Sequence, residues 1–122
     1  MPKITVITGE QGSGKSTLAR RLALGKKWIV KYNVNKNTLN RFFDNIDETT
    51  EVIIIDELIC NTKKDNEDLI KFFASLSSIE IRKPYSIKRI TIKVPEMIII
   101  CRNVNAKKFK DWDMIDFIEC NL

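Results

Sequence analysis

The placement of its glycines constrains what this chain can fold into more than any other feature of the sequence. The chain has 122 residues but only four glycines, and three of them, Gly9, Gly12 and Gly14, lie within six residues. Because glycine adopts backbone conformations that other residues avoid, this cluster marks a turn of unusual geometry. The β-branched, apolar residues 3–8 before the cluster favour a buried strand, and a helical spacing of leucine and alanine begins at Lys15. The sequence therefore predicts a strand, a glycine-rich loop and a helix in direct succession.

Residues 9–16 form a phosphate-loop motif, also called Walker A. They read Gly-Glu-Gln-Gly-Ser-Gly-Lys-Ser, which fits G-x-x-x-x-G-K-[ST] at every fixed position. In such a loop, backbone N–H groups and the positive end of the following helix surround the phosphates of a nucleotide. Lys15 reaches the β- and γ-phosphates, and Ser16 offers its hydroxyl to Mg²⁺. We therefore predict a site for ATP and Mg²⁺ whose nucleotide-binding residues are Gly9, Gly12, Ser13, Gly14, Lys15, Ser16 and Thr17.

A second motif, of the Walker B type, lies where an apolar strand ends in two carboxylates. Residues 52–55 read Val-Ile-Ile-Ile and are followed by Asp56 and Glu57. Asp56 is predicted to hold Mg²⁺ together with Ser16. Glu57 is placed to orient and deprotonate a water molecule, which indicates hydrolysis rather than transfer of phosphate to a metabolite. Lys15 and Glu57 are therefore predicted to be catalytic.

The remaining segments alternate between strand-like and helix-like patterns. This favours a mostly parallel sheet flanked by helices, in a single domain that spans residues 1–122. Helices are expected from Asn37 or Thr38 through Ile46, and from Asp65 onward. Residues 79–94 alternate with a period of two on either side of a turn at 83–86, which predicts a β-hairpin. Further strands are expected at residues 28–33, 51–55 and 97–101, and the tail at 112–120 is either a strand or a short helix.

Positive charge is concentrated in one part of the chain. Residues 79–110 carry nine basic and two acidic side chains, a net charge of +7, which is enough to attract a polyanion. A solvated lysine-rich surface is the alternative interpretation. The chain contains no histidine, which excludes Ser-His-Asp and Cys-His catalysis and histidine-based zinc sites.

Cysteine usage and hydropathy indicate the compartment. Cys60, Cys101 and Cys120 are odd in number and too sparse for a disulfide framework, so a reducing, cytoplasmic environment is expected. No apolar run approaches the ~18 residues of a membrane span, and no apolar signal region precedes the first strand. We therefore expect no membrane partner.

Taken in order, these motifs resemble those of the superfamily 3 helicases of small viruses, phages and plasmids, which are relatives of the AAA+ ATPases. The similarity runs from Gly9 to Asn103, as phosphate loop, Asp-Glu strand, basic hairpin and a strand ending in asparagine. It implies a three-layer α/β sandwich with strand order 1-4-3-2, or 5-1-4-3-2 if the tail adds a strand. It also implies that Asn103 is a catalytic sensor of the γ-phosphate, and that the hairpin grips single-stranded DNA in the pore of a ring. The hairpin residues that fit this role are Arg82, Lys83, Tyr85, Lys88, Arg89 and Lys93.

The sequence departs from that family at several points. Its last core strand ends Cys101-Arg102-Asn103, where the family has Thr-Ser-Asn. The family's arginine finger lies downstream of this strand, but no arginine follows Arg102, which leaves Arg102, Arg82 or Arg89 to act on a neighbouring subunit. Without an oligomerisation or origin-binding domain, the chain is expected to be a bare ATPase core, and a homo-oligomeric ring would lack the usual finger.

Three functions remain open on the sequence. The first is a Mg²⁺-dependent ATPase coupled to nucleic acid, supported by Glu57, Asn103 and the basic hairpin. The second is a nucleotide-binding module that acts through a protein partner and hydrolyses little by itself, which the missing finger favours. The third is a small nucleotide kinase, disfavoured by the short chain, by Glu57 beside the metal-binding aspartate and by the lack of an arginine-rich lid.

Overall fold

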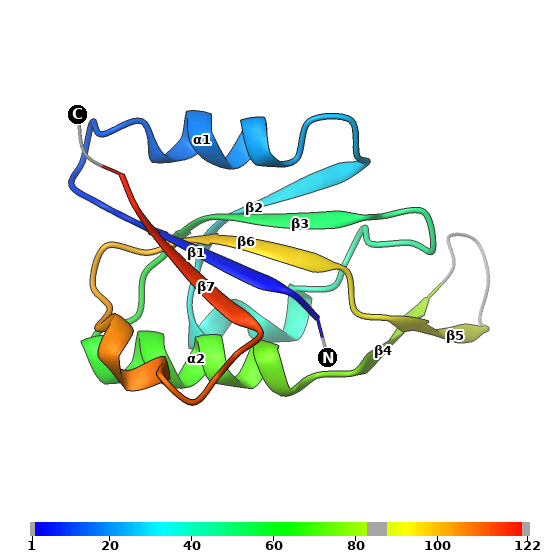
Figure 1. Ribbon diagram of the computed structural model, residues 1–122. Coiled ribbons are helices and arrows are strands. Elements are labelled where there is room, and N and C mark those ends of the chain that lie inside the picture. The colour runs from blue at the N-terminus through cyan, green and yellow to red at the C-terminus, as the bar shows by residue number, and fades with distance from the viewer. Residues whose placement is uncertain (1, 83–87, 121–122) are drawn as a thin grey trace.

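The main sheet of the protein has five strands: β1 (Ile4–Thr8), β2 (Trp28–Val34), β3 (Val52–Leu58), β6 (Glu96–Ile100) and β7 (Ile115–Glu119). The computed structural model describes residues 2–82 and 88–120 of the chain. The strands lie in the order β2-β3-β6-β1-β7, and every neighbouring pair is parallel (Figure 1). The expected order 5-1-4-3-2 left out the hairpin, so its strands 1 to 5 correspond to β1, β2, β3, β6 and β7. The observed arrangement confirms that order, and the tail of the chain forms a strand beside β1.

One α-helix covers each face of this sheet in the described part of the chain. Helix α1 (Lys15–Leu22) lies on one face and helix α2 (Lys63–Ser75) on the other (Figure 1). The 3₁₀ segments η1 (Lys36–Arg41) and η2 (Ala106–Phe109) lie on the side of α2. The fold is therefore mixed α/β with a mostly parallel sheet, although one helix on a face does not by itself establish a three-layer sandwich. Neither of these two helices has the length and apolar character that crossing a membrane requires.

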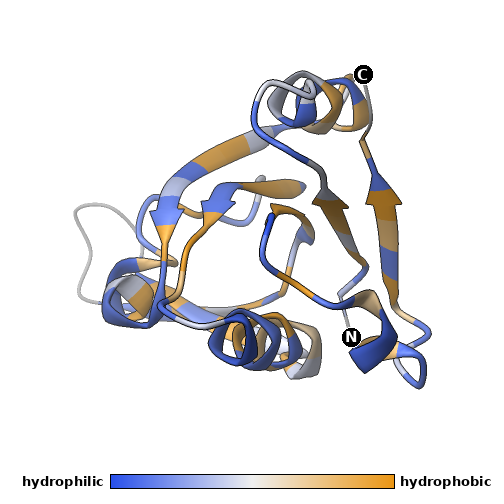
Figure 2. Ribbon diagram, turned by 90° about the vertical axis from the view of Figure 1, so that its left-hand side faces the viewer, coloured by the Kyte–Doolittle hydropathy of each residue, from blue (hydrophilic) through white to orange (hydrophobic). Residues whose placement is uncertain are grey.

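The central strands are buried on both faces, which explains why they read as nearly continuous apolar runs. In β3, Ile53 and Ile55 join the larger core, on the side of α2, whereas Val52 and Ile54 join a smaller core that contains Ala19 of α1. Figure 2 shows apolar residues concentrated on the strands, with hydrophilic residues over much of the helices. Because successive side chains of a strand point to opposite faces, one short segment contributes to both cores.

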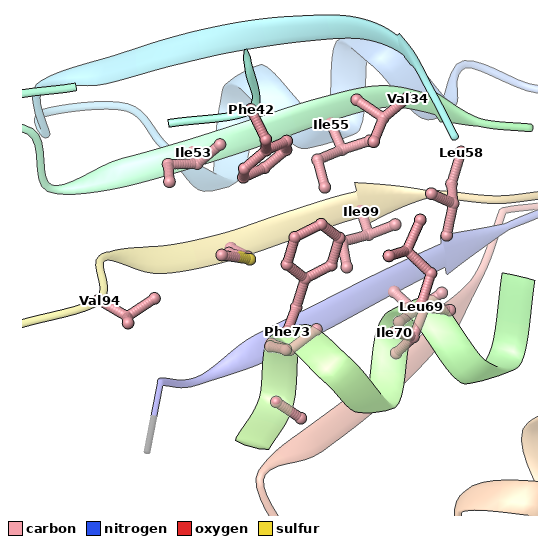
Figure 3. Packing of buried hydrophobic residues seen from close by; sticks show 14 of the residues in the cluster. Val34, Phe42, Ile53, Ile55, Leu58, Leu69, Ile70, Phe73, Val94 and Ile99 are labelled. Atoms are coloured by element: carbon pink, nitrogen blue, oxygen red, sulfur yellow. The ribbon is translucent and has the colours of Figure 1, made fainter. Parts of the chain in front are cut away.

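Aromatic rings fill the larger core. Phe73 of α2 has no solvent exposure, and the centre of its ring lies 4.7 Å from that of Phe42, which follows η1. Figure 3 shows the two rings beside Ile53, Ile55 and Ile99 of the central strands. This contact joins α2 and the segment after η1 to the same face of the sheet.

Two helix predictions were wrong in detail. The helix expected through Ile46 is instead the short 3₁₀ segment η1, with a reciprocal capping box of Asn35 and Thr38 at its start. The N–H groups that follow bond to carbonyls three residues back, as from Phe42 to Leu39, which is the tighter 3₁₀ pattern and not the α-helical one. Helix α2 begins before the expected cap: the hydroxyl of Thr62 accepts a hydrogen bond from the backbone N–H of Asp65 at 3.1 Å. Threonine, and not the aspartate, therefore caps α2.

The antiparallel hairpin is confirmed, as β4 (Ser78–Arg82) paired with β5 (Arg89–Lys93). Its isoleucines pack against the larger core, and its polar and charged residues alternate with them on the exposed face. The hairpin projects from the end of the sheet at which the parallel strands begin, opposite to the end that carries the glycine-rich loop (Figure 1). Lys83 and Tyr85, both predicted to bind nucleic acid, lie outside the described residues.

The packing of α2 makes a direct prediction about stability. Phe73→Ala is expected to lower the free energy of unfolding by about 3–5 kcal/mol, because it empties a fully buried ring site. Phe72→Ala makes the same change at the next residue, which is 45% exposed, and should lower the free energy of unfolding by less than about 1 kcal/mol. Urea denaturation of the two variants measures the difference, and equal losses would contradict this position for α2.

Candidate functional site

The loop between β1 and α1 has a backbone that requires glycine at two positions. Gly9 has a φ of 144°, and a side chain there would collide with the backbone carbonyl of Cys120 beyond the end of β7. Gly14 has a φ of 86°, in the left-handed region, and it is the residue from which α1 starts. Because Gly14 has no side chain with which to cap the helix, the first N–H groups of α1 are left to an external acceptor. The loop therefore has the geometry of an anion-binding turn.

Lys15 is the first residue of α1 and is largely buried, with 8% of its surface exposed. Its ammonium group donates a hydrogen bond to the backbone carbonyl of Glu10 at 2.5 Å and lies 3.5 Å from the hydroxyl of Ser13. A buried ammonium needs oxygen partners, and here the loop itself provides them. The lysine is therefore held at the loop, at the place where a bound phosphate would compete for it.

The predicted metal-binding residues lie together although they are 40 residues apart in the sequence. The hydroxyl of Ser16 donates a hydrogen bond to Oδ1 of Asp56 at 3.0 Å. Arg20, one turn further along α1, lies 3.7 Å from Oδ2 of Asp56 and also donates to the backbone carbonyl of Ser16 at 3.3 Å. Sequence reasoning missed Arg20, whose only signal is its spacing of four residues from Ser16 on the same helix face.

Ser16 and Asp56 fit Mg²⁺ only together with additional ligands. The described residues contain no group of three acidic, cysteine or histidine side chains that could hold a metal by themselves. A serine hydroxyl and one carboxylate are hard oxygen donors of the kind Mg²⁺ prefers, and Mg²⁺ commonly takes its remaining ligands from phosphates and water. Ser16 and Asp56 would thus hold Mg²⁺ together with a phosphate-bearing ligand.

Glu57 has an uncommon backbone conformation. Its φ is 89°, and Asn33 beside it on β2 has a φ of 51°. The parallel ladder pairs Tyr32 with Asp56 and then Val34 with Leu58, so Glu57 and Asn33 lie between two regular pairs. Non-glycine residues in this region are rare and concentrate at functional sites. No sequence pattern predicts this conformation.

The carboxylate of Glu57 is paired with an arginine from the next strand along the sheet. Nε of Arg102, just beyond β6, lies 3.4 Å from Oε1 of Glu57, and both side chains are partly exposed. Both residues also line two cavities at this edge of the sheet. From the sequence, Arg102 was expected only to act on a neighbouring subunit, so its contact with Glu57 of the same chain is a finding of the structure.

The two cavities lie on either side of the glycine-rich loop. The smaller, of about 410 Å³, is lined by Lys15, Ser16, Thr17 and Asn33 in addition to Glu57 and Arg102. The larger, of about 1050 Å³, is lined by loop residues from Gly9 to Ser13 and by side chains from the ends of β3, β6 and β7. Asn103, the predicted sensor, is exposed and borders the larger cavity. The structure thus brings together every predicted phosphate, metal and catalytic residue at one edge.

Buried polar side chains at the start of α2 hold the loop that contains Asn103. Asn66 is 1% exposed, donates a hydrogen bond to the backbone carbonyl of Asn103 at 3.0 Å and accepts one from the N–H of Cys60 at 2.8 Å. Glu67 accepts a hydrogen bond from the N–H of Asn105 at 2.9 Å. Sequence reasoning missed Asn66, although its helical spacing before apolar Ile70 and Phe73 places an amide on the buried face.

The three thiols occupy different environments. Burial raises the pKa of Cys101 to about 12 and also raises the pKa of Cys60, so both stay protonated at neutral pH. Cys120 donates from Sγ to the backbone carbonyl of Ser13 at 2.9 Å and so joins the end of β7 to the loop. Cys60 and Cys120 line the larger cavity, whereas Cys101 is buried in the larger core.

The basic hairpin does not reach this site. Arg82, Arg89 and Lys93 lie on β4 and β5, at the opposite end of the sheet from the loop (Figure 1). Lys88 directly precedes β5. Among the described residues, the structure therefore separates those predicted to bind nucleic acid from those predicted to bind phosphate.

Fold and site together define a mixed α/β protein in which a glycine-rich loop and an acidic strand meet at the carboxyl edge of a parallel sheet. Residues 1–113 match the model of the virulence-associated protein E-like domain, and the chain belongs to that family. The resemblance to superfamily 3 helicases and AAA+ ATPases was therefore wrong as a family assignment. It depended on the two phosphate-site motifs, the basic hairpin and Asn103, and features of this kind are shared by different families, whereas the strand ending and the arginine finger typical of those helicases were already missing.

Among solved structures, the chain is similar to one described as the A form apo structure of the NrS-1 C-terminal region. The two share 17% sequence identity with a TM-score of 0.64, and the match covers 98% of this chain and 29% of that one. The chain thus spans less than a third of the length of this structural neighbour, and at such low identity the likeness shows the fold alone. A search of the curated proteins finds no match.

The buried amide of Asn66 offers a test of how the site is held. Asn66→Ala is expected to lower the free energy of unfolding by about 1–3 kcal/mol, because it removes the buried amide that bonds the N–H of Cys60 and the carbonyl of Asn103. Asp68→Ala, on the exposed face of the same helix, should change it by less than about 0.5 kcal/mol. Urea denaturation measures both, and a neutral Asn66→Ala would show that the amide does not organise these loops.

Proposed function

We propose that the protein binds a nucleoside triphosphate with Mg²⁺ at residues 9–16 and hydrolyses it. The observation that carries this proposal is the contact of Ser16 with Asp56, 3.0 Å between hydroxyl and carboxylate, at the residue that follows the largely buried Lys15 in the chain. These three groups match the three tasks of phosphate-site chemistry: two oxygen ligands for Mg²⁺ and one cation for the β- and γ-phosphates. ATP is the nucleotide we choose to test.

Each residue of the site has a separate role in the proposed reaction. The N–H groups at the start of α1 bind the phosphates, and the ammonium of Lys15 leaves the carbonyl of Glu10 to contact them. Mg²⁺, which Ser16 and Asp56 would hold, would supply positive charge that offsets the charge of the phosphates. Glu57 orients a water molecule and takes its proton as the water oxygen bonds to the γ-phosphorus. The bond from that phosphorus to the bridging oxygen breaks at the same time, and ADP and phosphate leave.

We also propose that the two faces of the sheet are covered as in a three-layer α/β sandwich. Two separate cores support this, one that includes Ala19 of α1 and one that includes Phe73 of α2. In such a fold ligands bind beyond the carboxyl ends of the strands, which is where the loop and Asp56 lie.

Lys15 provides the sharpest test of nucleotide binding. Lys15→Ala is expected to lower ATP affinity by roughly 10- to 100-fold and to abolish phosphate release, because one charged hydrogen-bond donor to the phosphates is lost. Lys3→Ala, an exposed lysine at the far end of β1, is the matched control and should leave both unchanged. Calorimetric titration with Mg-ATP and a phosphate-release assay measure the effects. Equal affinity of the Lys15 and Lys3 variants would refute the proposed site.

The same assay separates the remaining alternatives. Phosphate release without any acceptor supports hydrolysis, whereas ADP formation only with an added nucleotide acceptor would indicate a kinase. Tight Mg-ATP binding with no phosphate release would indicate the partner-dependent module. The ion pair between Glu57 and Arg102 supports this last alternative, because it occupies the proposed base and would keep the turnover of the isolated chain low.

We further propose that the hairpin binds single-stranded nucleic acid through its outer face. Arg82 lies directly opposite Arg89 across the antiparallel ladder, and Lys93 shares their exposed face. A group of cations on one exposed face raises the local positive potential and attracts a polyanion. A phosphate backbone is the anion that fits an extended row of cations.

The hairpin is connected to the nucleotide site by one short strand. Strand β5 leads through Val94 and Pro95 into β6, and Arg102 and Asn103 follow the end of β6. Val94 is buried in the larger core, so a displacement of the hairpin is passed to a packed strand. This connection supports coupling between nucleic-acid binding and nucleotide turnover.

Charge reversal on the hairpin tests this proposal. The double variant Arg89→Glu and Lys93→Glu is expected to remove stimulation of ATP turnover by single-stranded DNA at low salt while leaving ATP affinity unchanged. The double variant Lys107→Glu and Lys108→Glu makes the same charge change on exposed residues of η2 and should retain the stimulation. A role for the hairpin face would be refuted if single-stranded DNA did not change ATP turnover by the parent protein. It would also be refuted if both double variants lost the stimulation equally.

A further inference from the structure

We propose that Arg102 binds the γ-phosphate of the nucleotide held by its own chain, and that this contact releases Glu57 to act on water. The inference rests on the proposed nucleotide site and goes beyond it by assigning the residue that distinguishes a triphosphate from a diphosphate. Arg102 would then act on the nucleotide of its own chain, whereas the sequence led us to expect a role on a neighbouring subunit.

The position of Arg102 is the first argument. It lines both cavities beside the glycine-rich loop, as Glu57 does. Its side chain is 50% exposed, so the guanidinium has room to move. Lys15 and Ser16 also line the smaller cavity, so a phosphate chain that they bind would share that cavity with Arg102.

The charges at this edge are the second argument. A triphosphate brings several negative charges, and the loop supplies one ammonium, that of Lys15. Arg20 is engaged with Asp56 and with the carbonyl of Ser16 on its own helix. Arg102 is instead paired with the carboxylate that the reaction needs as a base. A γ-phosphate therefore offers Arg102 a new partner and leaves Glu57 with its proton-accepting oxygens free.

The two possible partners of Arg102 differ in strength. Its present contact with Glu57 joins one nitrogen to one oxygen at 3.4 Å, and both side chains are partly exposed, so water screens the attraction. A guanidinium and a phosphate form two parallel, shorter hydrogen bonds. The phosphate contact is the stronger one, and binding of a triphosphate shifts Arg102 away from Glu57.

The arrangement predicts how the site responds to its product. ADP has no γ-phosphate, so in the ADP state Arg102 returns to Glu57 and the base is again neutralised. The ion pair thus holds the site inactive when it is empty or filled with product.

The first experiment compares affinities for a non-hydrolysable ATP analogue and for ADP, each with Mg²⁺. Arg102→Ala is expected to weaken binding of the ATP analogue by about 10- to 100-fold and binding of ADP by less than about twofold. Arg102→Lys should restore part of the preference, because it keeps the charge but loses the paired geometry. Arg41→Ala, an exposed arginine of η1 that borders neither cavity, is the matched control and should change neither affinity.

A double-mutant cycle tests the competition with Glu57. Glu57→Gln removes the anion that holds Arg102, so it is expected to strengthen binding of the ATP analogue about threefold, as loss of a screened ion pair would. In the Arg102→Ala background the same Glu57→Gln change should have no effect. Additive effects of the two changes would refute the competition.

The outcomes separate this inference from the function on which it rests. If Lys15→Ala abolishes binding but Arg102→Ala weakens the ATP analogue and ADP equally, the nucleotide site stands and the role of Arg102 falls. If neither nucleotide binds the parent protein, the proposed function itself falls. If Arg102→Ala does not fold, the Arg102→Lys variant and the Glu57→Gln measurement decide the question.

Discussion

Parallel pairing of all five strands is the constraint on which the site depends. Because β1, β3 and β6 run side by side in the same direction, their carboxyl ends meet at one edge of the sheet. The glycine-rich loop leaves β1 at that edge, Asp56 lies near the end of β3, and Arg102 follows β6. Residues separated by 40 positions in the sequence therefore come within hydrogen-bonding distance. Antiparallel pairing of any one of these strands would place its polar end at the opposite edge.

Much of this arrangement could be predicted, because the signals were local. Apolar runs such as residues 52–55 mark strands buried on both faces, and the glycine-rich loop requires the strand before it and the helix after it to converge. The strand order followed from the resemblance and is confirmed, although the family it came from was wrong. A strand order is shared by many families of one fold, so a correct topology is weak support for a particular family.

The parts that could not be predicted depend on contacts between distant segments. The left-handed backbone of Glu57 lies between two regular pairs of the β2–β3 ladder, and no local pattern records it. The pairing of Arg102 with Glu57 needs β6 to lie beside β3. Asn66 carried a faint signal as an amide on an apolar helix face, but its partners, Cys60 and Asn103, are known only from the fold. The position of the hairpin, far from the loop, likewise follows from tertiary packing.

The conformation of Glu57 is maintained by the core rather than by its ion pair. A non-glycine residue in the left-handed region costs about 1–3 kcal/mol, which the neighbouring structure must offset. The ladder resumes immediately beyond Glu57, where Val34 pairs with Leu58, and both side chains are almost completely buried. Burial of each such side chain contributes about 1.5–3 kcal/mol, which is enough to hold the strained residue in place. Burial of Val34 and Leu58 in the larger core thus fixes the backbone of Glu57. The carboxylate of Glu57 can therefore change its partner while β3 stays in place.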